Sequence, residues 1–141
     1  MNLLHASNTN KTHRIDLDSY TLYVQEASRD FAKLQSHKQP ADTDSDHDLL
    51  ESALYKVKQA LELNPIGMKG LNLFARIELF RGNPHQAQVI IERALIAKPD
   101  SPTALYSAGH IALALGQLAF AEQYFNASLK ISKVATRSAS S

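Results

Sequence analysis

The sequence predicts an all-α fold in which pairs of helices are stacked as repeats. The main observation is an internal period of 34 residues, because the stretch 65–98 is matched position by position by the stretch 99–132. A fixed period of this length is typical of repeat architectures, in which each repeat is one helix pair. Two further observations agree, namely apolar residues spaced three and four apart and glycine or proline where helices should end. Identical residues recur at Leu71 and Leu105, Ile77 and Ile111, Leu79 and Leu113, Gly82 and Gly116, Ala87 and Ala121, and Leu95 and Leu129.

Length and composition indicate one small globular domain. The chain has 141 residues, of which 44% are hydrophobic and 21% charged, an ordinary globular composition. No apolar run reaches the roughly 18 residues that a membrane-spanning helix needs. The net charge of +1 gives no electrostatic footprint for nucleic acid or an anionic membrane, and the absence of cysteine excludes disulfides and thiolate chemistry. The N-terminus lacks the basic and apolar regions of a secretory signal, so we expect a cytoplasmic protein.

The N-terminal part is predicted to hold a flexible arm and one amphipathic helix. Residues 1–14 are polar and without periodicity, which is typical of a flexible arm. The helix follows over 17–34, where Asp16 or Asp18 would cap its first turn. Six apolar residues spaced three and four apart form one stripe on this helix, namely Leu17, Tyr20, Val24, Ala27, Phe31 and Leu34. We interpret the stripe as core-facing, and a self-associating coiled-coil seam is the alternative.

Residues 36–48 are predicted to form an acidic loop. Pro40 lies within this segment, and no apolar residue larger than alanine does. Its alternating aspartates resemble the start of a calcium-binding loop. However, His47 stands where that loop needs its sharp-turn glycine, and Ala53 stands where it needs the closing glutamate. The prediction is therefore a solvated linker without a metal, and calcium binding is the alternative.

Five further helices are predicted, separated by proline or glycine. The first covers 49–63, starts with a capping box of Asp48 and Glu51, and ends before Pro65. Proline ends a helix because the residue that precedes it is pushed out of the helical region. The other four of these helices are expected over 67–80, 84–97, 102–115 and 118–131.

Residues 133–141 follow the last helix. They are polar and are predicted to be a disordered tail.

The two copies share a pattern of large, small and glycine positions. In each copy a large apolar residue opens the first helix, a small residue stands where the paired helices would touch, and glycine occupies the turn. The matched pairs are Leu71/Leu105, Ala75/Gly109, Gly82/Gly116, Ala87/Ala121, Ile91/Phe125, Ala94/Ser128 and Pro65/Pro99. This pattern resembles the tetratricopeptide-repeat family, whose units are 34-residue helix-turn-helix pairs. Glu78 departs from it, since the family usually has a large residue there, and Lys133 replaces the last proline.

The resemblance extends to a third, degenerate repeat. Four residues of helix 49–63 match second-helix residues of the later copies, namely Ala53, Val57, Ala60 and Leu61. The first helix of that repeat should come directly before it, where the acidic loop lies instead. We therefore interpret helix 17–34 as this first helix, displaced by an insertion that a surface loop tolerates. The resemblance then implies an α-solenoid of about three repeats over 15–132, made of the degenerate repeat 15–64 and the regular repeats 65–98 and 99–132.

The family resemblance also implies a concave groove, lined by the first helices of successive repeats, that holds a peptide or a helix of a partner. Carried over to this sequence, the groove residues are Lys69, Asn72, Arg76 and Phe80 from one repeat and Thr103, Tyr106, His110 and Leu113 from the next. The carboxylate clamp with which some members bind acidic carboxyl-terminal peptides is incomplete here. We expect an adaptor, scaffold or chaperone-like module whose groove accepts an acidic or extended peptide of an unidentified partner. Ordinary solvated helix charges are the alternative interpretation of Lys69 and Arg76.

No catalytic residue, metal site or cofactor is predicted. The six histidines are scattered, and the sequence has no phosphate-binding glycine loop, zinc-protease motif or nucleophile elbow. We therefore expect that the chain is not an enzyme by itself. The alternative function is the regulatory repeat region of a larger enzyme, such as a transferase.

Helix 118–131 is expected to leave apolar surface exposed. Repeat arrays usually finish with a helix whose outer face is polar, and no such helix follows in the sequence. Exposed apolar patches commonly mark association. We expect either a homodimer, formed through this helix or through the 17–34 stripe, or a chain whose next element is missing.

Overall fold

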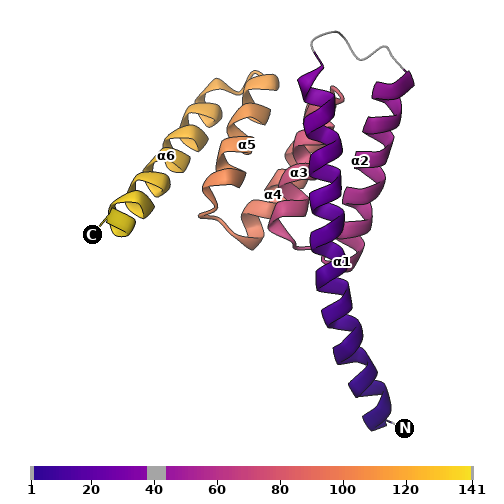
Figure 1. Ribbon diagram of the computed structural model, residues 1–141. Coiled ribbons are helices and arrows are strands. Elements are labelled where there is room, and N and C mark those ends of the chain that lie inside the picture. The colour runs from indigo at the N-terminus through magenta and orange to yellow at the C-terminus, as the bar shows by residue number, and fades with distance from the viewer. Residues whose placement is uncertain (1, 38–43, 141) are drawn as a thin grey trace. The chain divides into compact units, whose positions relative to one another are not determined.

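The computed structural model describes residues 2–37 and 44–140 and is all-α over these residues (Figure 1). The helices follow one another in antiparallel pairs, as the repeat pattern predicts. The chain divides into two compact units, Met1–Pro65 and Ile66–Ser141. The first unit contains one helix pair and the second contains two. The helices are α1 (Asn2–Ser36), α2 (Asp44–Leu63), α3 (Met68–Phe80), α4 (Pro84–Ala97), α5 (Pro102–Ala114) and α6 (Leu118–Ser140).

In the first unit, α1 and α2 contact each other as an antiparallel pair. The core-facing interpretation of the 17–34 stripe is confirmed for its C-terminal four residues, while Leu17 is exposed and Tyr20 half-buried. The buried side chains of the pair are Val24, Ala27, Phe31 and Leu34 from α1 and Ala53, Leu54, Val57 and Ala60 from α2. Because most of the stripe is buried, it does not offer the surface that a self-associating seam would need.

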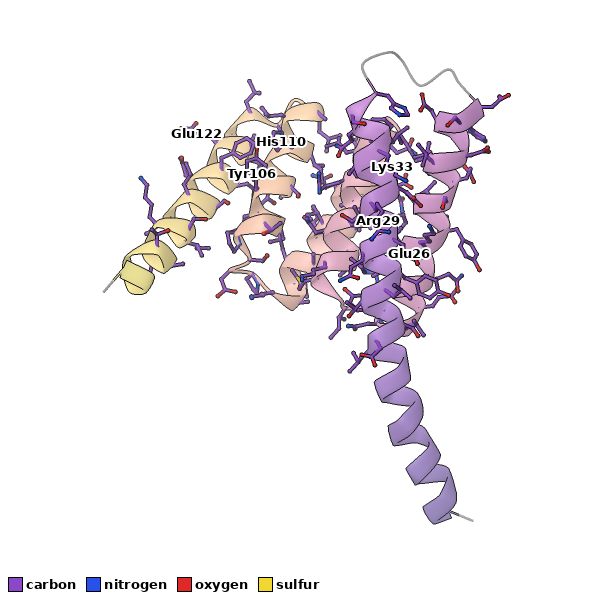
Figure 2. The ribbon with its side chains drawn as sticks, viewed as in Figure 1. Glu26, Arg29, Lys33, Tyr106, His110 and Glu122 are labelled. Atoms are coloured by element: carbon purple, nitrogen blue, oxygen red, sulfur yellow. The ribbon has the colours of Figure 1, made fainter. Side chains whose placement is uncertain are left out.

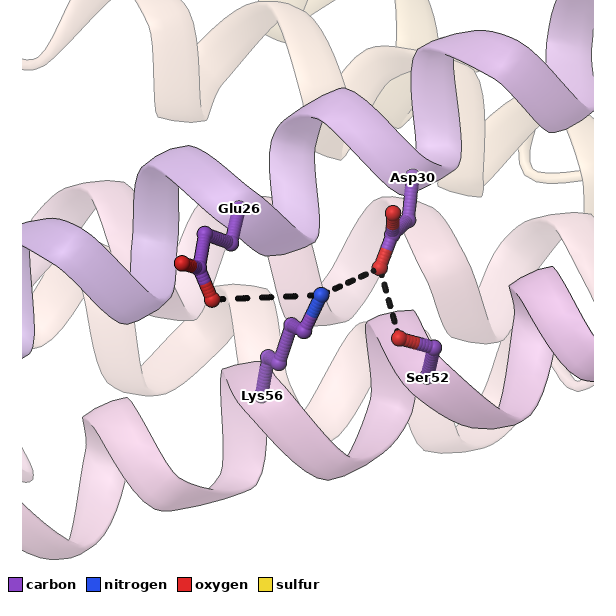
Figure 3. A network of polar contacts seen from close by, with 4 residues as sticks. All are labelled: Glu26, Asp30, Ser52 and Lys56. Carbon is purple, nitrogen blue, oxygen red and sulfur yellow. Dashed lines mark hydrogen bonds and ion pairs between the residues drawn. The ribbon is translucent and has the colours of Figure 1, made fainter.

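A polar network fixes α1 against α2 (Figure 3). The Asp30 carboxylate accepts hydrogen bonds from Lys56 Nζ at 2.9 Å and from Ser52 Oγ at 2.7 Å, and Glu26 lies 3.8 Å from the same Nζ. Burial alone would raise the pKa of Asp30, but the bonds from Lys56 and Ser52 and the charges of Lys56 and Lys33 outweigh it and hold that pKa below its ordinary value. The network therefore favours the charged carboxylate and one register of the two helices.

The two ends of the chain differ from the sequence prediction. α1 begins at Asn2, so residues 2–14, which were expected to form a flexible arm, continue the helix, and Asp16 and Asp18 are helical residues rather than caps. At the other end α6 continues to Ser140, through most of the expected tail. The physical reason is common to both ends: neither segment contains proline or glycine, so no residue interrupts the backbone hydrogen bonds of the helix.

The acidic loop is shorter than predicted. α2 begins at Asp44, four residues before the expected capping box, so the prediction that Asp48 and Glu51 form this box is wrong. Acidic residues in the first turn, Asp44 and Asp46, favour this earlier start because the helix N-terminus carries partial positive charge. Asp46 is buried and hydrogen-bonds to Nδ1 of His37, which joins the end of α1 to the start of α2. Residues 38–43, with Asp42 of the calcium alternative, lie outside the described residues.

In the second unit, helix ends follow the glycine and proline signals closely. Gly82 and Gly116 lie in the α3–α4 and α5–α6 turns with φ of 83° and 74°, a conformation that side chains disfavour. Pro84 and Pro102 start α4 and α5, and the Ser101 hydroxyl caps α5 by accepting from the Ala104 amide at 3.3 Å. Contacts join α3 to α4, α5 to α6, and α5 to both α3 and α4. The largest fully buried side chains of this unit are Leu71, Ile77, Ile90, Ile91 and Ile111.

Glu78, the residue that departs from the family pattern, is a buried polar anchor of the α3–α4 turn. Its carboxylate accepts from Arg81 at 2.7 Å and from the side-chain amide of Asn83 at 2.9 Å, and its carbonyl accepts from the Asn83 backbone amide. A buried carboxylate is tolerated only when it is hydrogen-bonded or paired, and Glu78 has both kinds of contact. A polar network thus occupies the position where the resemblance predicts an aromatic or other large residue.

Candidate functional site

Four of the predicted site residues lie on α3, along one side of the helix. Lys69, Arg76 and Phe80 are exposed, while Asn72 is half-buried. Spacings of three and four residues place consecutive members of this set one turn apart. The side therefore presents two cationic side chains, one before and one after the half-buried amide of Asn72, followed by an exposed aromatic ring.

Asn72 contains an unusual polar atom. Its Oδ1 is buried and has no hydrogen-bond partner among the described residues. Most buried polar atoms in folded proteins are hydrogen-bonded, and leaving one unpaired costs about 1–3 kcal/mol. The atom is an acceptor, and because it is buried a donor on a bound molecule would reach it only if the Asn72 side chain turned outward.

The other four predicted residues lie on α5, where two of them belong to an aromatic cluster. Tyr106, Leu113 and His110 are exposed. The rings of Tyr106 and His110 meet edge to face with centroids 4.6 Å apart, and Phe125 of α6 meets both, at 5.6 Å and 5.2 Å. Figure 2 labels Tyr106 and His110 on α5. Edge-to-face contacts between aromatic rings are favourable, so Phe125 supports this orientation of the two exposed rings.

The predicted site residues on α3 and those on α5 lie on two helices that contact each other. α3 and α5 contact each other within the second unit, so both groups belong to one packed body. Thr103 is exposed on the first turn of α5. Phe125 is the contributor that sequence reasoning missed as part of the site, although its pairing with Ile91 across the repeats marked it as bulky. The signal that could have found it is Gly109, which leaves room for a ring from α6.

We use the name binding face for the exposed and half-buried side chains of α3 and α5, Lys69, Asn72, Arg76, Phe80, Thr103, Tyr106, His110 and Leu113. Its polar groups on α3 are two cations and an amide, and its α5 part is mainly aromatic and aliphatic. Such a surface can attract carboxylates through Lys69 and Arg76 and cover apolar side chains. A pocket of about 490 Å³ lies elsewhere, at the α3–α4 turn, lined by residues Gly82 to Gln86.

Comparison with solved structures identifies the architecture. The chain superimposes on the crystal structure of a thermophilic tetratricopeptide-repeat protein from Thermus thermophilus with a TM-score of 0.69, at 20% sequence identity, over 84% of this chain and 61% of that one. The chain has a tetratricopeptide-repeat fold. About three tetratricopeptide-type repeats account for its helix pairs, as the period predicts. The chain spans less than two thirds of the Thermus protein.

Comparisons based on the sequence alone give no result beyond this structural match. No protein-family model and no curated protein sequence matches the chain. Folds of this type generally serve as protein-binding modules. Among the described residues, no helix is long and apolar enough to cross a membrane, and no group of three or more His, Asp or Glu side chains is placed to hold a metal ion.

Proposed function

We propose that the protein is an adaptor or scaffold, or a chaperone-like module, that holds an acidic, extended segment of a partner protein on the binding face of α3 and α5. The observation that carries the proposal is the pair of exposed cations Lys69 and Arg76 on one side of α3, with Asn72, whose Oδ1 has no hydrogen-bond partner among the described residues, between them. An extended peptide has backbone N–H groups to donate, and acidic side chains would pair with the two cations.

The α5 part of the binding face supplies the apolar contacts. Tyr106 and Leu113 are 55% and 46% exposed, and the ring of Tyr106 is held by His110 and Phe125. Rigid aromatic side chains are common binding anchors because little conformational entropy is lost when they are covered. We therefore expect the partner segment to alternate acidic residues with at least one large apolar residue. The expected site of action is the cytoplasm.

A displayed library of random acidic peptides tests the proposal. We expect enriched peptides to lose about tenfold or more in affinity when Arg76 or Lys69 is replaced by alanine, since charge-assisted hydrogen bonds to a partner contribute roughly 1.5–3 kcal/mol. Lys98→Ala is the matched control, because Lys98 is an exposed cation after α4 and outside the binding face. Equal losses for Lys98 and Arg76 variants would show only non-specific charge attraction, and unchanged affinity for the α3 variants would contradict the proposal.

A further inference from the structure

α6 carries a stripe of exposed and half-buried side chains that repeats a stripe of α4. We use the name α6 stripe for Leu118, Glu122, Phe125, Leu129 and Lys133, which are spaced four, three, four and four residues apart and so lie on one side of the helix. Shifted back by the 34-residue period, Phe125 corresponds to Ile91 and Leu129 to Leu95. The two stripes therefore occupy equivalent places in successive repeats.

The two stripes differ in whether a helix covers them. α5 packs on the α3–α4 pair, where Ile91 is 2% exposed and Leu95 half-buried. On the α5–α6 pair, Leu129 is 57% exposed and Phe125 half-buried, although they hold the same positions in the repeat. Burying the exposed part of two large apolar side chains would contribute favourably at about 25 cal/mol per Å² of apolar area.

A side-chain hydrogen bond also joins the covered stripe of α4 to the residue that precedes α6. Gln88, the counterpart of Glu122 on α4, donates from Nε2 to Oε1 of Gln117, which directly precedes α6, at 3.1 Å. Glu122 is exposed on α6, as Figure 2 shows. A carboxylate at this position would suit a cationic partner from whatever helix lies across it.

The charges of the α6 stripe are arranged so that two copies of the stripe can pair with each other. Glu122 and Lys133, of opposite charge, flank the apolar pair Phe125 and Leu129. If two α6 helices lie antiparallel with a two-fold axis midway between Phe125 and Leu129, each Phe125 meets the other copy's Leu129. The same operation brings each Glu122 beside the other copy's Lys133. Two-fold contacts of this kind, in which one patch faces itself, are the commonest form of self-association.

We propose that the α6 stripe pairs with the α6 stripe of a second copy of the chain in this antiparallel, two-fold arrangement. Within one chain, α5 follows α4 after the short connection 98–101 and packs back along it. In the proposed dimer, α6 of the second copy would pack along α6 in the same way. The proposal goes beyond partner binding, because it concerns a second copy of the chain and only Phe125 of the α6 stripe also contacts residues of the binding face, Tyr106 and His110.

Analytical ultracentrifugation over a wide concentration range tests the pairing. We expect the wild-type chain to approach twice its monomer mass of 15.6 kDa as concentration rises. Leu129→Glu should leave a monomer at all concentrations. Ile96→Glu is the matched control, because Ile96 is 81% exposed on α4 and outside the stripe, so this variant should dimerise like the wild type. A wild-type monomer throughout, or equal effects of Leu129→Glu and Ile96→Glu, would overturn the proposal.

A charge swap tests the antiparallel arrangement itself. Glu122→Lys and Lys133→Glu should each weaken the dimer by about tenfold, since each creates two like-charge contacts across the two-fold axis. The double variant should regain wild-type affinity, because opposite charges again face each other. A double variant as weak as the single ones would contradict the two-fold pairing of residues 122 and 133. Acidic-peptide binding by Leu129→Glu should be unchanged, so failure of the dimer and failure of the binding face are separable.

Discussion

Phe125 of α6 packs directly over Gly109 of α5. A Cβ atom added at Gly109 would lie 2.5 Å from Phe125 Cε1, closer than any relaxed contact allows. The absence of a side chain at residue 109 therefore lets the ring reach Tyr106 and His110, and it joins the packing of the last helix pair to the orientation of two residues in the binding face.

Gly109→Ala should destabilise the second unit by about 1–3 kcal/mol, because the added methyl group overpacks the Phe125 ring. Urea unfolding followed by circular dichroism measures this loss. Adding Phe125→Leu to Gly109→Ala should cost less than the sum of the two single changes, since the smaller side chain makes room for the methyl group. Strictly additive losses would show that the contact between residues 109 and 125 does not cause the effect.

Gly82→Ala and Gly116→Ala should each destabilise the protein by about 1–2 kcal/mol for a different reason. A Cβ atom at either position would meet no other atom within 4 Å, so the cost comes from the positive φ alone. Thermal unfolding of the two variants measures it. A Gly82→Asn variant is the control, because asparagine tolerates the left-handed conformation better and should lose less than alanine. Equal stability of wild type and both alanine variants would contradict the described turns.

The stability of the α1–α2 pair should fall in acid because of Asp30. Its folded-state pKa lies below the ordinary value of 3.8, so the stabilisation is complete well above that pH and is lost as pH falls through the folded-state pKa. Replacing Asp30 with asparagine should cost about 1–2 kcal/mol at neutral pH and flatten this acid dependence. Denaturant unfolding at a series of pH values measures both effects. Glu26→Gln serves as the control, because Glu26 is more exposed and its 3.8 Å contact with Lys56 is longer. An Asp30→Asn variant with the wild-type pH profile would contradict the assignment.

Asn72→Ala should separate stability from binding. The change removes a buried acceptor that has no partner among the described residues, so we expect the melting temperature to stay the same or rise slightly. Affinity for selected acidic peptides should fall, because the bound segment loses its hydrogen bond to Oδ1. Differential scanning calorimetry and peptide titration on the same sample measure the two quantities. A clear drop in melting temperature with unchanged peptide affinity would assign Asn72 to the core instead.

The fold of 65–132 was predictable because its signals are local and repeated. Gly82 and Gly116 mark turns that demand positive φ, and Pro84 and Pro102 mark first helical turns, so helix ends were found to within a few residues. The ends of α1 and α6 were missed because a helix without proline or glycine carries no stop signal. The start of α2 was placed too late for another reason, because Asp48 and Glu51 have the spacing of a capping box although the helix already begins at Asp44.

The binding face was predictable only as positions on two helices. Its residues follow from the resemblance and from spacing, and the structure places them on one side of α3 and on α5. The unpaired atom of Asn72 and the ring contacts of Phe125 depend on how helices pack, which no spacing reveals. Glu78 is an intermediate case. Arg81 and Asn83, its partners, follow within five residues, so a polar turn could have been inferred from the sequence.

The most direct test of the central claim, that the binding face of α3 and α5 holds a partner segment, is a two-dimensional NMR titration of the protein with an enriched acidic peptide. The account predicts that the largest amide shifts map to residues 69–80 and 103–113 and that Arg76→Ala abolishes them at the same peptide concentration. Shifts confined to the exposed side of α4, around Val89 and Ile96, would contradict it.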